Sequence, residues 1–266
     1  MSDRPGQVPS EALERSHMLN FAALGFTSEE AVVVTGSGNG IGRATAVVLA
    51  RSGPLVVAWD VDESGLSSLV DEITDEGGRA IAVTVDLNDE EAIASAWDRS
   101  ASVGLPIPYL VNNAGPASTT DLTVMEGLRR SVGSYVAVTD EWLGRWGREA
   151  KSVTFTASIA GNYYAGATRD WYPTGKAAVA GYTRHLAVKH RGAPRSNAVA
   201  PGGIVTQRTS EAYATPAMKA RLERQPMQRP GNPDEIAAVI CFLLSPAASF
   251  VNGVVLPIDG GATLSM

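Results

Sequence analysis

Short apolar runs alternate along this chain with longer segments whose apolar residues recur at helical spacing. Runs of this length that are rich in Val, Ile and Ala are typical of strands buried on both faces of a parallel sheet. We place seven such runs at residues 31–35, 55–60, 80–85, 109–112, 152–156, 196–199 and 254–258. The alternation predicts an α/β fold, a single doubly wound domain in which helices cover both faces of a seven-stranded parallel sheet.

The chain has 266 residues, which fits one domain of this kind. We expect residues 30–266 to form it, with a polar, helix-like segment near residues 206–228 that acts as a lid over a substrate; the alternative is that this segment only packs against the domain. Residues 1–29 form an N-terminal extension. Its first part contains Pro and Gly and is expected to be disordered, whereas Ser10 to Leu24 is compatible with a short helix capped by Ser10.

A glycine-rich segment follows the first predicted strand and leads into a stretch of helical spacing. It reads Gly36-Ser37-Gly38-Asn39-Gly40-Ile41-Gly42. Glycines at such a turn let the backbone reverse tightly and let a pyrophosphate approach the first N–H groups of the helix. Strand, glycine turn and helix in this order predict a dinucleotide site.

The second predicted strand ends at Asp60. An acid at this distance from a glycine turn can bind the ribose 2′-hydroxyl of NAD. The same carboxylate would repel the 2′-phosphate of NADP, and the next residues, Val61 and Asp62, supply no positive charge. We therefore expect NAD rather than NADP as the cofactor. The alternative is that Asp60 is an ordinary turn residue at the end of a strand.

Tyr172 and Lys176 are four positions apart, so on a helix their side chains share one face. A free phenol has a pKa of about 10 and is a poor acid or base at neutral pH. A neighbouring ammonium favours the phenolate and lowers that pKa. The pair can therefore transfer protons. The alternative is a chance spacing, against which the glycine turn upstream argues.

Charge and composition exclude several classes of function. The formal charge of −6 and a pI near 5.2 argue against nucleic acid or an anionic membrane as a partner. The single cysteine, Cys241, has no internal partner for a disulfide, which suits the cytoplasm. His17, His185 and His190 are too far apart in the sequence for a metal-binding motif, so we expect no metal.

The motifs taken together resemble those of the short-chain dehydrogenase/reductase family. Thr35-Gly36-x-x-x-Gly40-Ile41-Gly42 and Tyr172-x-x-x-Lys176 carry the resemblance, in this order and separation. Further similar segments are Asp86-Leu87, Asn112-Asn113-Ala114-Gly115, Ser158-Ile159-Ala160-Gly161, residues 197–202 and Asp259-Gly260-Gly261. The resemblance covers about residues 30 to 262 and implies a Rossmann-type fold.

The resemblance also implies roles for individual residues. Ser158 would orient the substrate oxygen and Tyr172 would be the acid/base. Lys176 would bind the nicotinamide ribose and lower the pKa of the tyrosine. The cofactor would lie against Gly36, Ser37, Asn39, Gly40, Ile41, Gly42, Asp60, Asp86, Leu87, Asn113, Ala114, Gly115, Tyr172, Lys176, Pro201, Gly202, Ile204 and Thr206.

The chain departs from the family pattern in two places: Ser158 and Tyr172 are 14 residues apart, one more than the resemblance leads us to expect, and one catalytic position differs. The family usually has an Asn in the helix before the serine strand, where it completes a proton relay through a water molecule. Ser131 stands at the comparable place. A serine hydroxyl can hold a water but lacks the amide carbonyl. We include Ser131 among the catalytic candidates for that reason.

The sequence thus predicts a short-chain oxidoreductase that transfers a hydride between NAD(H) and a secondary alcohol or ketone, with Tyr172 as acid/base. One alternative is a 3-oxoacyl-thioester reductase, against which Asp60 argues because such reductases mostly use NADPH. Another is a cofactor-binding regulator without turnover, which Ser131 favours. The resemblance further implies a homo-oligomer, and we expect a homotetramer.

Overall fold

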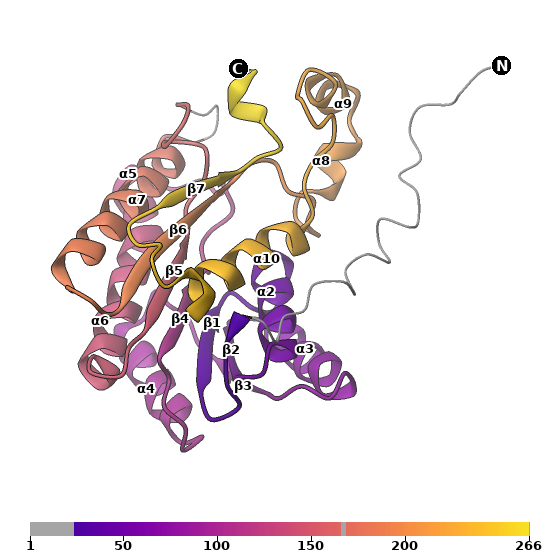
Figure 1. Ribbon diagram of the computed structural model, residues 1–266. Coiled ribbons are helices and arrows are strands. Elements are labelled where there is room, and N and C mark those ends of the chain that lie inside the picture. Colours follow the sequence, from indigo (N-terminus) through magenta and orange to yellow (C-terminus); the bar gives the residue numbers. More distant parts are fainter. Residues whose placement is uncertain (1–23, 166–168, 266) are drawn as a thin grey trace.

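The computed structural model describes residues 24–165 and 169–265. Seven strands form one parallel sheet in the order β3-β2-β1-β4-β5-β6-β7 (Figure 1). The predicted α/β fold with seven parallel strands is confirmed. The strands are β1 (Ala31–Thr35), β2 (Leu55–Asp60), β3 (Ala80–Thr84), β4 (Tyr109–Asn112), β5 (Ser152–Thr156), β6 (Arg195–Pro201) and β7 (Val255–Ile258).

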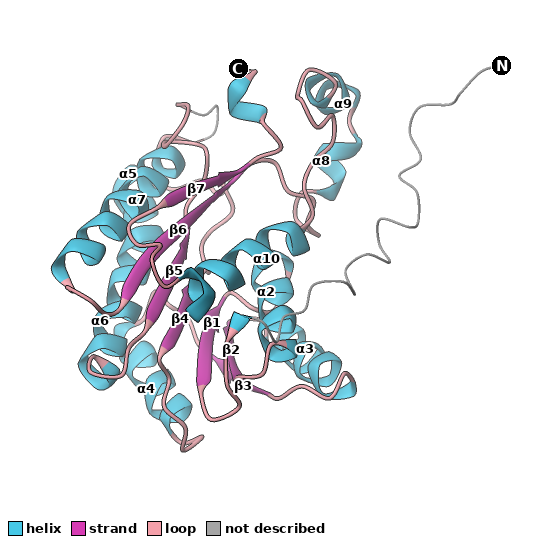
Figure 2. Cartoon of the chain, viewed as in Figure 1, coloured by secondary structure: helices cyan, strands magenta, loops and turns pink. Residues whose placement is uncertain are grey.

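Helices cover both faces of the sheet (Figure 2). One face packs against α4 (Glu90–Ala101), α6 (Ser134–Trp146) and α7 (Trp171–Lys189). The other packs against α2 (Gly40–Arg51), α3 (Glu63–Asp75) and α10 (Pro233–Leu244). The shorter elements are α5 (Val124–Leu128), a π-helical turn (Arg129–Gly133), α8 (Ser210–Ala214), α9 (Pro216–Leu222) and two 3₁₀ turns (Pro246–Ala248 and Ala262–Leu264).

Alternation along the strands divides the apolar residues into two cores. Successive side chains of a strand point to opposite faces, so Val33 joins the core under α4, α6 and α7, whereas Val32 and Val34 join the core under α2, α3 and α10. Residues of β1 are buried on both faces. This is why the strands appear in the sequence as continuous apolar runs rather than as alternating patterns.

The sheet has a switch point next to β1. This strand pairs with β2 on one side and with β4 on the other. The chain therefore runs from β1 through β2 to β3 at one edge of the sheet, and then returns to the other side of β1 to form β4. Ligands of open α/β sheets bind in the crevice that such a reversal creates at the carboxyl ends of the strands. The strand ends at Thr35, Asp60, Asn112, Thr156 and Pro201 border this region.

Two further predictions concern the ends of the fold. The short helix expected within Ser10 to Leu24 lies outside the described residues, apart from Leu24 itself. The segment at residues 206–228 contains α8 and α9, which stand beyond the carboxyl ends of β6 and β7 (Figure 1). Within the described part of the chain, no helix combines the length and apolar character that crossing a membrane requires.

Candidate active site

The glycine turn joins β1 to α2, and its positions Gly36 and Gly42 have no space for a side chain. Gly36 and Gly40 have φ angles of +68° and +57°, which other residues rarely adopt. A Cβ at Gly42 would overlap the carbonyl oxygen of Gly36, and one at Gly36 would lie 2.7 Å from Ala114 Cα. Asn39 caps α2 without a side-chain hydrogen bond, and the first turn of α2 contains no acid. The N-terminus of α2 is thus open to an anion.

Asp60, the last residue of β2, is tied to this turn. Its Oδ2 accepts a hydrogen bond from the Gly38 N–H at 2.8 Å, and its Oδ1 accepts one from the Asp62 N–H at 3.0 Å. Asp62 in turn caps α3 by accepting from the Gly65 N–H, and this bond lowers the pKa of the Asp62 carboxyl. The carboxylate of Asp60 is therefore fixed beside the glycine turn.

Asn113 connects the turn to β5. Its Nδ2 donates to the carbonyl oxygens of Thr35 and Gly36 at 3.3 and 3.2 Å, and its Oδ1 accepts from Thr156 Oγ1 at 3.1 Å. Its backbone N–H donates to Thr35 Oγ1 at 3.0 Å. Hydrogen bonds at both ends of the amide hold the segment after β4 in place next to the turn.

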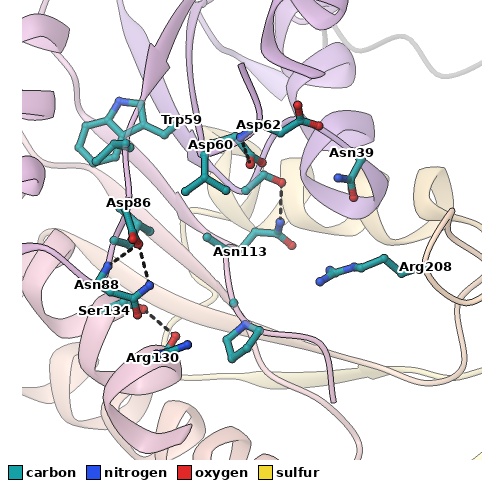
Figure 3. Close-up of a pocket in the computed structure, with 17 residues that line it drawn as sticks. Asn39, Trp59, Asp60, Asp62, Asp86, Asn88, Asn113, Arg130, Ser134 and Arg208 are labelled. Atoms are coloured by element: carbon teal, nitrogen blue, oxygen red, sulfur yellow. Dashed lines mark hydrogen bonds between the residues drawn. The ribbon is translucent and has the colours of Figure 1, made fainter. Parts of the chain in front are cut away.

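These segments enclose a pocket of about 350 Å³ at the carboxyl edge of the sheet (Figure 3). Asp86 lines it and accepts hydrogen bonds from the backbone and side-chain nitrogens of Asn88 at 2.9 and 2.6 Å. The volume is in the range of ligand-binding pockets. The lining residues are Gly36, Asn39, Trp59, Asp60, Val61, Asp62, Val85, Asp86, Leu87, Asn88, Asn113, Ala114, Gly115, Pro116, Arg130, Ser134 and Arg208.

Lys176 lies in the second turn of α7 and is buried. Its Nζ donates to the carbonyl oxygen of Thr156 at 2.7 Å, and it lies 5.7 Å from the ring centroid of Tyr135 and 5.9 Å from that of Tyr172. Burial lowers the pKa of Lys176 to about 8, and the positive charge of Arg208 acts in the same direction. The ammonium is therefore held between two phenol rings at the end of β5.

Tyr172 is the second residue of α7 and is partly buried. Burial raises the pKa of its phenol, and a hydrogen bond with Ser158 opposes the rise, as does the charge of Arg208. The sequence predicted that Lys176 lowers the pKa of Tyr172, but in the structure the pKa of Tyr172 is raised. The Lys176 ammonium donates to the Thr156 carbonyl instead, and loss of solvent around the phenol is the larger effect.

Asn162, which the sequence motifs did not include, joins the serine and the lysine. Its Nδ2 donates to the carbonyl oxygens of Ser158 and Lys176 at 2.8 and 3.1 Å. Close by, Gly161 has a φ of +80°, and a Cβ there would overlap the carbonyl oxygen of Pro173. The loop after β5 is therefore packed directly against the first turn of α7, which keeps Ser158 next to Tyr172.

Ser131 lies in the π-helical turn and packs against α7. Its Oγ donates to the carbonyl oxygen of Gly127 at 2.6 Å, and a Cβ at Gly175 would lie 2.5 Å from the same Oγ. Trp171 covers Gly127, where a Cβ would overlap the indole. Ser131 thus faces the residue next to Lys176, while its hydroxyl donates within its own helical segment. Its part in a proton relay stays a prediction.

The segment after β6 covers the side of the pocket opposite β2. Thr206 lies over the glycine turn, since its Cγ2 would be 3.4 Å from a Cβ at Gly40. The Tyr213 hydroxyl, on α8, reaches Gly203, where a Cβ would overlap it. Burial raises the pKa of Tyr213. The short helices of this segment are therefore anchored to the strand end by close contacts at glycines.

The structure brings together many of the predicted cofactor contacts but not all of them. Those that line the pocket are Gly36, Asn39, Asp60, Asp86, Leu87, Asn113, Ala114 and Gly115. Gly40 and Thr206 line a neighbouring groove between α2 and α10. Ser37, Ile41, Pro201 and Ile204 pack behind the pocket wall, as do Gly42 and Gly202, which contact backbone.

Sequence reasoning did not identify several residues that line the pocket. They come from separate segments and belong to no local motif: Trp59, Asn88, Pro116, Arg130, Ser134 and Arg208. Arg208 could have been found from the sequence, because it follows the predicted cofactor contact Thr206 by two positions. Thr156, whose carbonyl oxygen accepts from Lys176, is a strand residue without a distinguishing pattern.

Comparison with known proteins agrees with this geometry. Residues 36–263 match the family model described as enoyl-(acyl carrier protein) reductase. The chain is 36% identical over 249 residues to cis-4-hydroxycyclohexanecarboxylate dehydrogenase of Sinomonas cyclohexanicum, covering 89% of this chain and 97% of that protein. It is 31% identical over 239 residues to a 3-oxoacyl-(acyl-carrier-protein) reductase of Thermotoga maritima, covering 87% and 97%.

A solved structure shows the same similarity in three dimensions. It is that of 7α-hydroxysteroid dehydrogenase complexed with NADH and 7-oxo glycochenodeoxycholic acid, with a TM-score of 0.82 and 30% identity, covering 92% of this chain and 98% of that one. The seven-stranded parallel sheet agrees with these matches. This chain belongs to the short-chain dehydrogenase/reductase family of oxidoreductases.

Proposed function

We propose that this protein is an NAD-dependent dehydrogenase that interconverts a secondary alcohol and the corresponding ketone. One observation carries the proposal: Lys176 Nζ lies 5.9 Å from the centroid of the Tyr172 ring at the end of β5, and Asn162 ties Lys176 to Ser158 by donating to the carbonyl oxygens of both. These three groups do not line the pocket themselves, but Thr156, which accepts from Lys176, donates to the pocket residue Asn113, and the pocket ends at an open helix N-terminus. Proton transfer and dinucleotide binding can therefore occur next to each other.

The pocket has features that suit a nicotinamide dinucleotide. Gly36 and Gly42 keep side chains away from the N-terminus of α2, which supports binding of a pyrophosphate there. The fixed carboxylate of Asp60 can accept a hydrogen bond from a ribose 2′-hydroxyl and would repel a 2′-phosphate, which supports NAD over NADP. When bound, the nicotinamide supplies or accepts the hydride.

The side chains of this protein would handle the proton and the substrate oxygen. Ser158 would orient that oxygen, and Tyr172 would take the proton from an alcohol or return it to a ketone. Burial favours the protonated phenol, the form that donates to a ketone. The hydrogen bond from Ser158 and the charge of Arg208 favour the phenolate, the form that accepts a proton from an alcohol. Lys176 would hold the nicotinamide ribose.

The proposal is tested by turnover with a panel of secondary alcohols. The Sinomonas relative is named for oxidation of a hydroxyl on a ring, so cyclic alcohols are the first substrates to try. Each alcohol is incubated with NAD and, separately, with NADP, and the absorbance of the reduced cofactor is followed. We expect turnover with NAD. A protein that binds NADH but converts none of the alcohols or ketones would instead fit a regulator without turnover.

A second candidate function is reduction of a 3-oxoacyl thioester. The Thermotoga relative and the description of the matching family model favour it. Asp60 argues against it, because reductases of that class mostly use NADPH. A 3-oxoacyl thioester offered with NADH and with NADPH separates the two candidates. Faster turnover of the thioester than of any ketone in the panel would favour the reductase.

A further inference from the structure

Arg208 stands at the tip of a tight turn between β6 and α8. The Thr206 carbonyl accepts hydrogen bonds from the N–H groups of Thr209 and Ser210, both at 3.0 Å. Thr209 Oγ1 donates to the Ile204 carbonyl at 2.7 Å and accepts from the Thr206 N–H at 2.8 Å. Because the turn satisfies its own polar groups, the backbone of Arg208 has a fixed position over the pocket.

The side chain of Arg208 extends from this turn into the pocket. Figure 3 shows it reaching into the hollow from the side away from Asp86 and below Asn39, the cap residue of α2. Among residues 24–165 and 169–265, its guanidinium has neither a hydrogen bond nor an ion pair. A guanidinium carries five N–H donors in a planar fork, which suits phosphate and carboxylate oxygens. The donors of Arg208 are free for a ligand.

The charges around Arg208 favour an anionic group as its ligand. Its charge lowers the pKa of Lys176, so two cations act on one another near the Tyr172 hydroxyl. The carboxylates that line the pocket are those of Asp60, Asp62 and Asp86, which belong to β2 and the segments after β2 and β3. In a dinucleotide, the anionic part is the pyrophosphate, which joins the adenosine to the nicotinamide ribose. The part of the pocket between Asn39 and Arg208, at the N-terminus of α2, is where that group would lie (Figure 3).

We propose that Arg208 binds the pyrophosphate of the dinucleotide from the lid side, opposite the N–H groups at the start of α2. The pyrophosphate would then be held by a rigid element on one side and by the lid segment on the other. Binding of the cofactor and packing of the lid stabilise each other, since each supplies a partner to the other. The inference rests on the proposed use of the pocket for a dinucleotide, and it is independent of which alcohol reacts.

Binding measurements without a substrate test this role. Calorimetry gives the Kd of NADH, of ADP-ribose, which has the pyrophosphate but no nicotinamide, and of adenosine, which has neither. Hydrogen bonds to charged groups contribute enough that Arg208→Met is expected to weaken NADH and ADP-ribose by about 10- to 100-fold. Adenosine binding should be unchanged. Arg208→Lys keeps the charge but loses the fork, so it should recover part of the affinity.

Arg221→Met is the matched control. Arg221 also belongs to the lid segment, on α9, and is exposed, but it does not line the pocket. Its loss should leave all three Kd values unchanged. Rising salt should reduce the difference in the Kd of ADP-ribose between wild type and Arg208→Met, because ions screen the attraction between the guanidinium and the pyrophosphate.

Two results would overturn the proposal. If Arg208→Met binds ADP-ribose as well as the wild type does, while its KM rises only for alcohols that carry a carboxylate, Arg208 belongs to the substrate site instead. If adenosine binding weakens as much as ADP-ribose binding, the effect is not specific to the pyrophosphate. Failure of the proposed function looks different, since wild-type protein would then bind none of the three ligands or would bind them without turnover.

Discussion

The buried ammonium of Lys176 donates its hydrogen bond to the carbonyl oxygen of Thr156 at 2.7 Å. The Tyr135 hydroxyl donates to the same oxygen at 3.5 Å. The acceptor is a neutral carbonyl at the end of β5 and not a carboxylate, so it does not neutralise the charge. Burial therefore dominates and lowers the pKa of Lys176 to about 8. The contact also fixes α7 to the strand that precedes Ser158.

The first prediction is a pH dependence of stability. Between pH 8 and the ordinary lysine value of 10.5, the unfolded chain binds more protons at Lys176 than the folded one, so folding becomes more favourable as the pH rises. Relative to Lys176→Met, the wild type should gain up to about 1.4 kcal/mol per pH unit in this window. Urea unfolding of both proteins from pH 7 to 10 measures the difference. A difference that stays constant with pH would contradict the low pKa.

The second prediction concerns Tyr172. Tyr172→Phe keeps the ring and removes the proton, so turnover should fall by about 10²- to 10⁴-fold while NADH binding is nearly unchanged. Tyr163→Phe is the control, because the Tyr163 hydroxyl donates to the Val255 carbonyl at 2.5 Å and belongs to the support of β7. It should lose some stability but keep most turnover. Near wild-type turnover in Tyr172→Phe would remove this residue from the proton transfer.

The third prediction separates the charge of Asp60 from its hydrogen bond. Asp60→Asn keeps a side-chain oxygen that can accept from the Gly38 N–H, yet it removes the negative charge. At an effective dielectric constant near 20, repulsion between two charges amounts to a few kcal/mol at contact, so the ratio of kcat/KM for NADP over NAD should rise at least tenfold. Adding Val61→Arg should raise it further. Wild-type protein that uses NADP as well as NAD would contradict the role of Asp60.

The fourth prediction concerns the contact of Ser131 with Gly175. A methyl at position 175 would lie 2.5 Å from Ser131 Oγ, so Gly175→Ala should destabilise the fold by about 1–3 kcal/mol. Ser131→Ala in the same chain removes that oxygen, and the nearest Ser131 atom is then Cβ at 3.5 Å. The double variant should recover about 1 kcal/mol or more relative to the sum of the two single changes. Additive effects in urea unfolding would show that the side chains do not meet.

The pH–rate profile of Ser131→Ala adds a second reading of the same position. The Ser131 hydroxyl donates to the Gly127 carbonyl, which suits a packing role for this side chain. A member of a proton relay would shift the profile when replaced. A residue that only packs against α7 would leave the shape of the profile unchanged while lowering stability.

The fifth prediction addresses assembly. We expect a homotetramer that pairs through α7, where a Cβ at Gly181 would meet open space. Gly181→Arg should therefore be tolerated by the single chain but disrupt assembly, and light scattering should show smaller species. Ser67→Arg, on the exposed side of α3, is the control and should leave assembly intact. A wild-type species of 27.8 kDa alone would reject the tetramer.

The sequence by itself determined the elements and the order of the motifs. The apolar runs marked the strands because a parallel sheet buries both faces, and the run ending at Thr35 led directly into the glycine turn. The spacing of Tyr172 and Lys176 placed both on one helix, since helical neighbours are set by local geometry. Patterns of this kind depend only on residues close together in the chain, so they can be recognised without knowledge of the fold.

The tertiary structure decided what surrounds each of these residues. Arg208, Asn162 and Thr156 belong to different segments, and no local pattern shows that they converge near Lys176. The direction of the Tyr172 pKa also depended on the fold, because it is set by how much solvent the packed chain removes from the phenol. Sequence spacing fixes which groups share a helix face, whereas burial and long-range contacts fix their charge state and their partners.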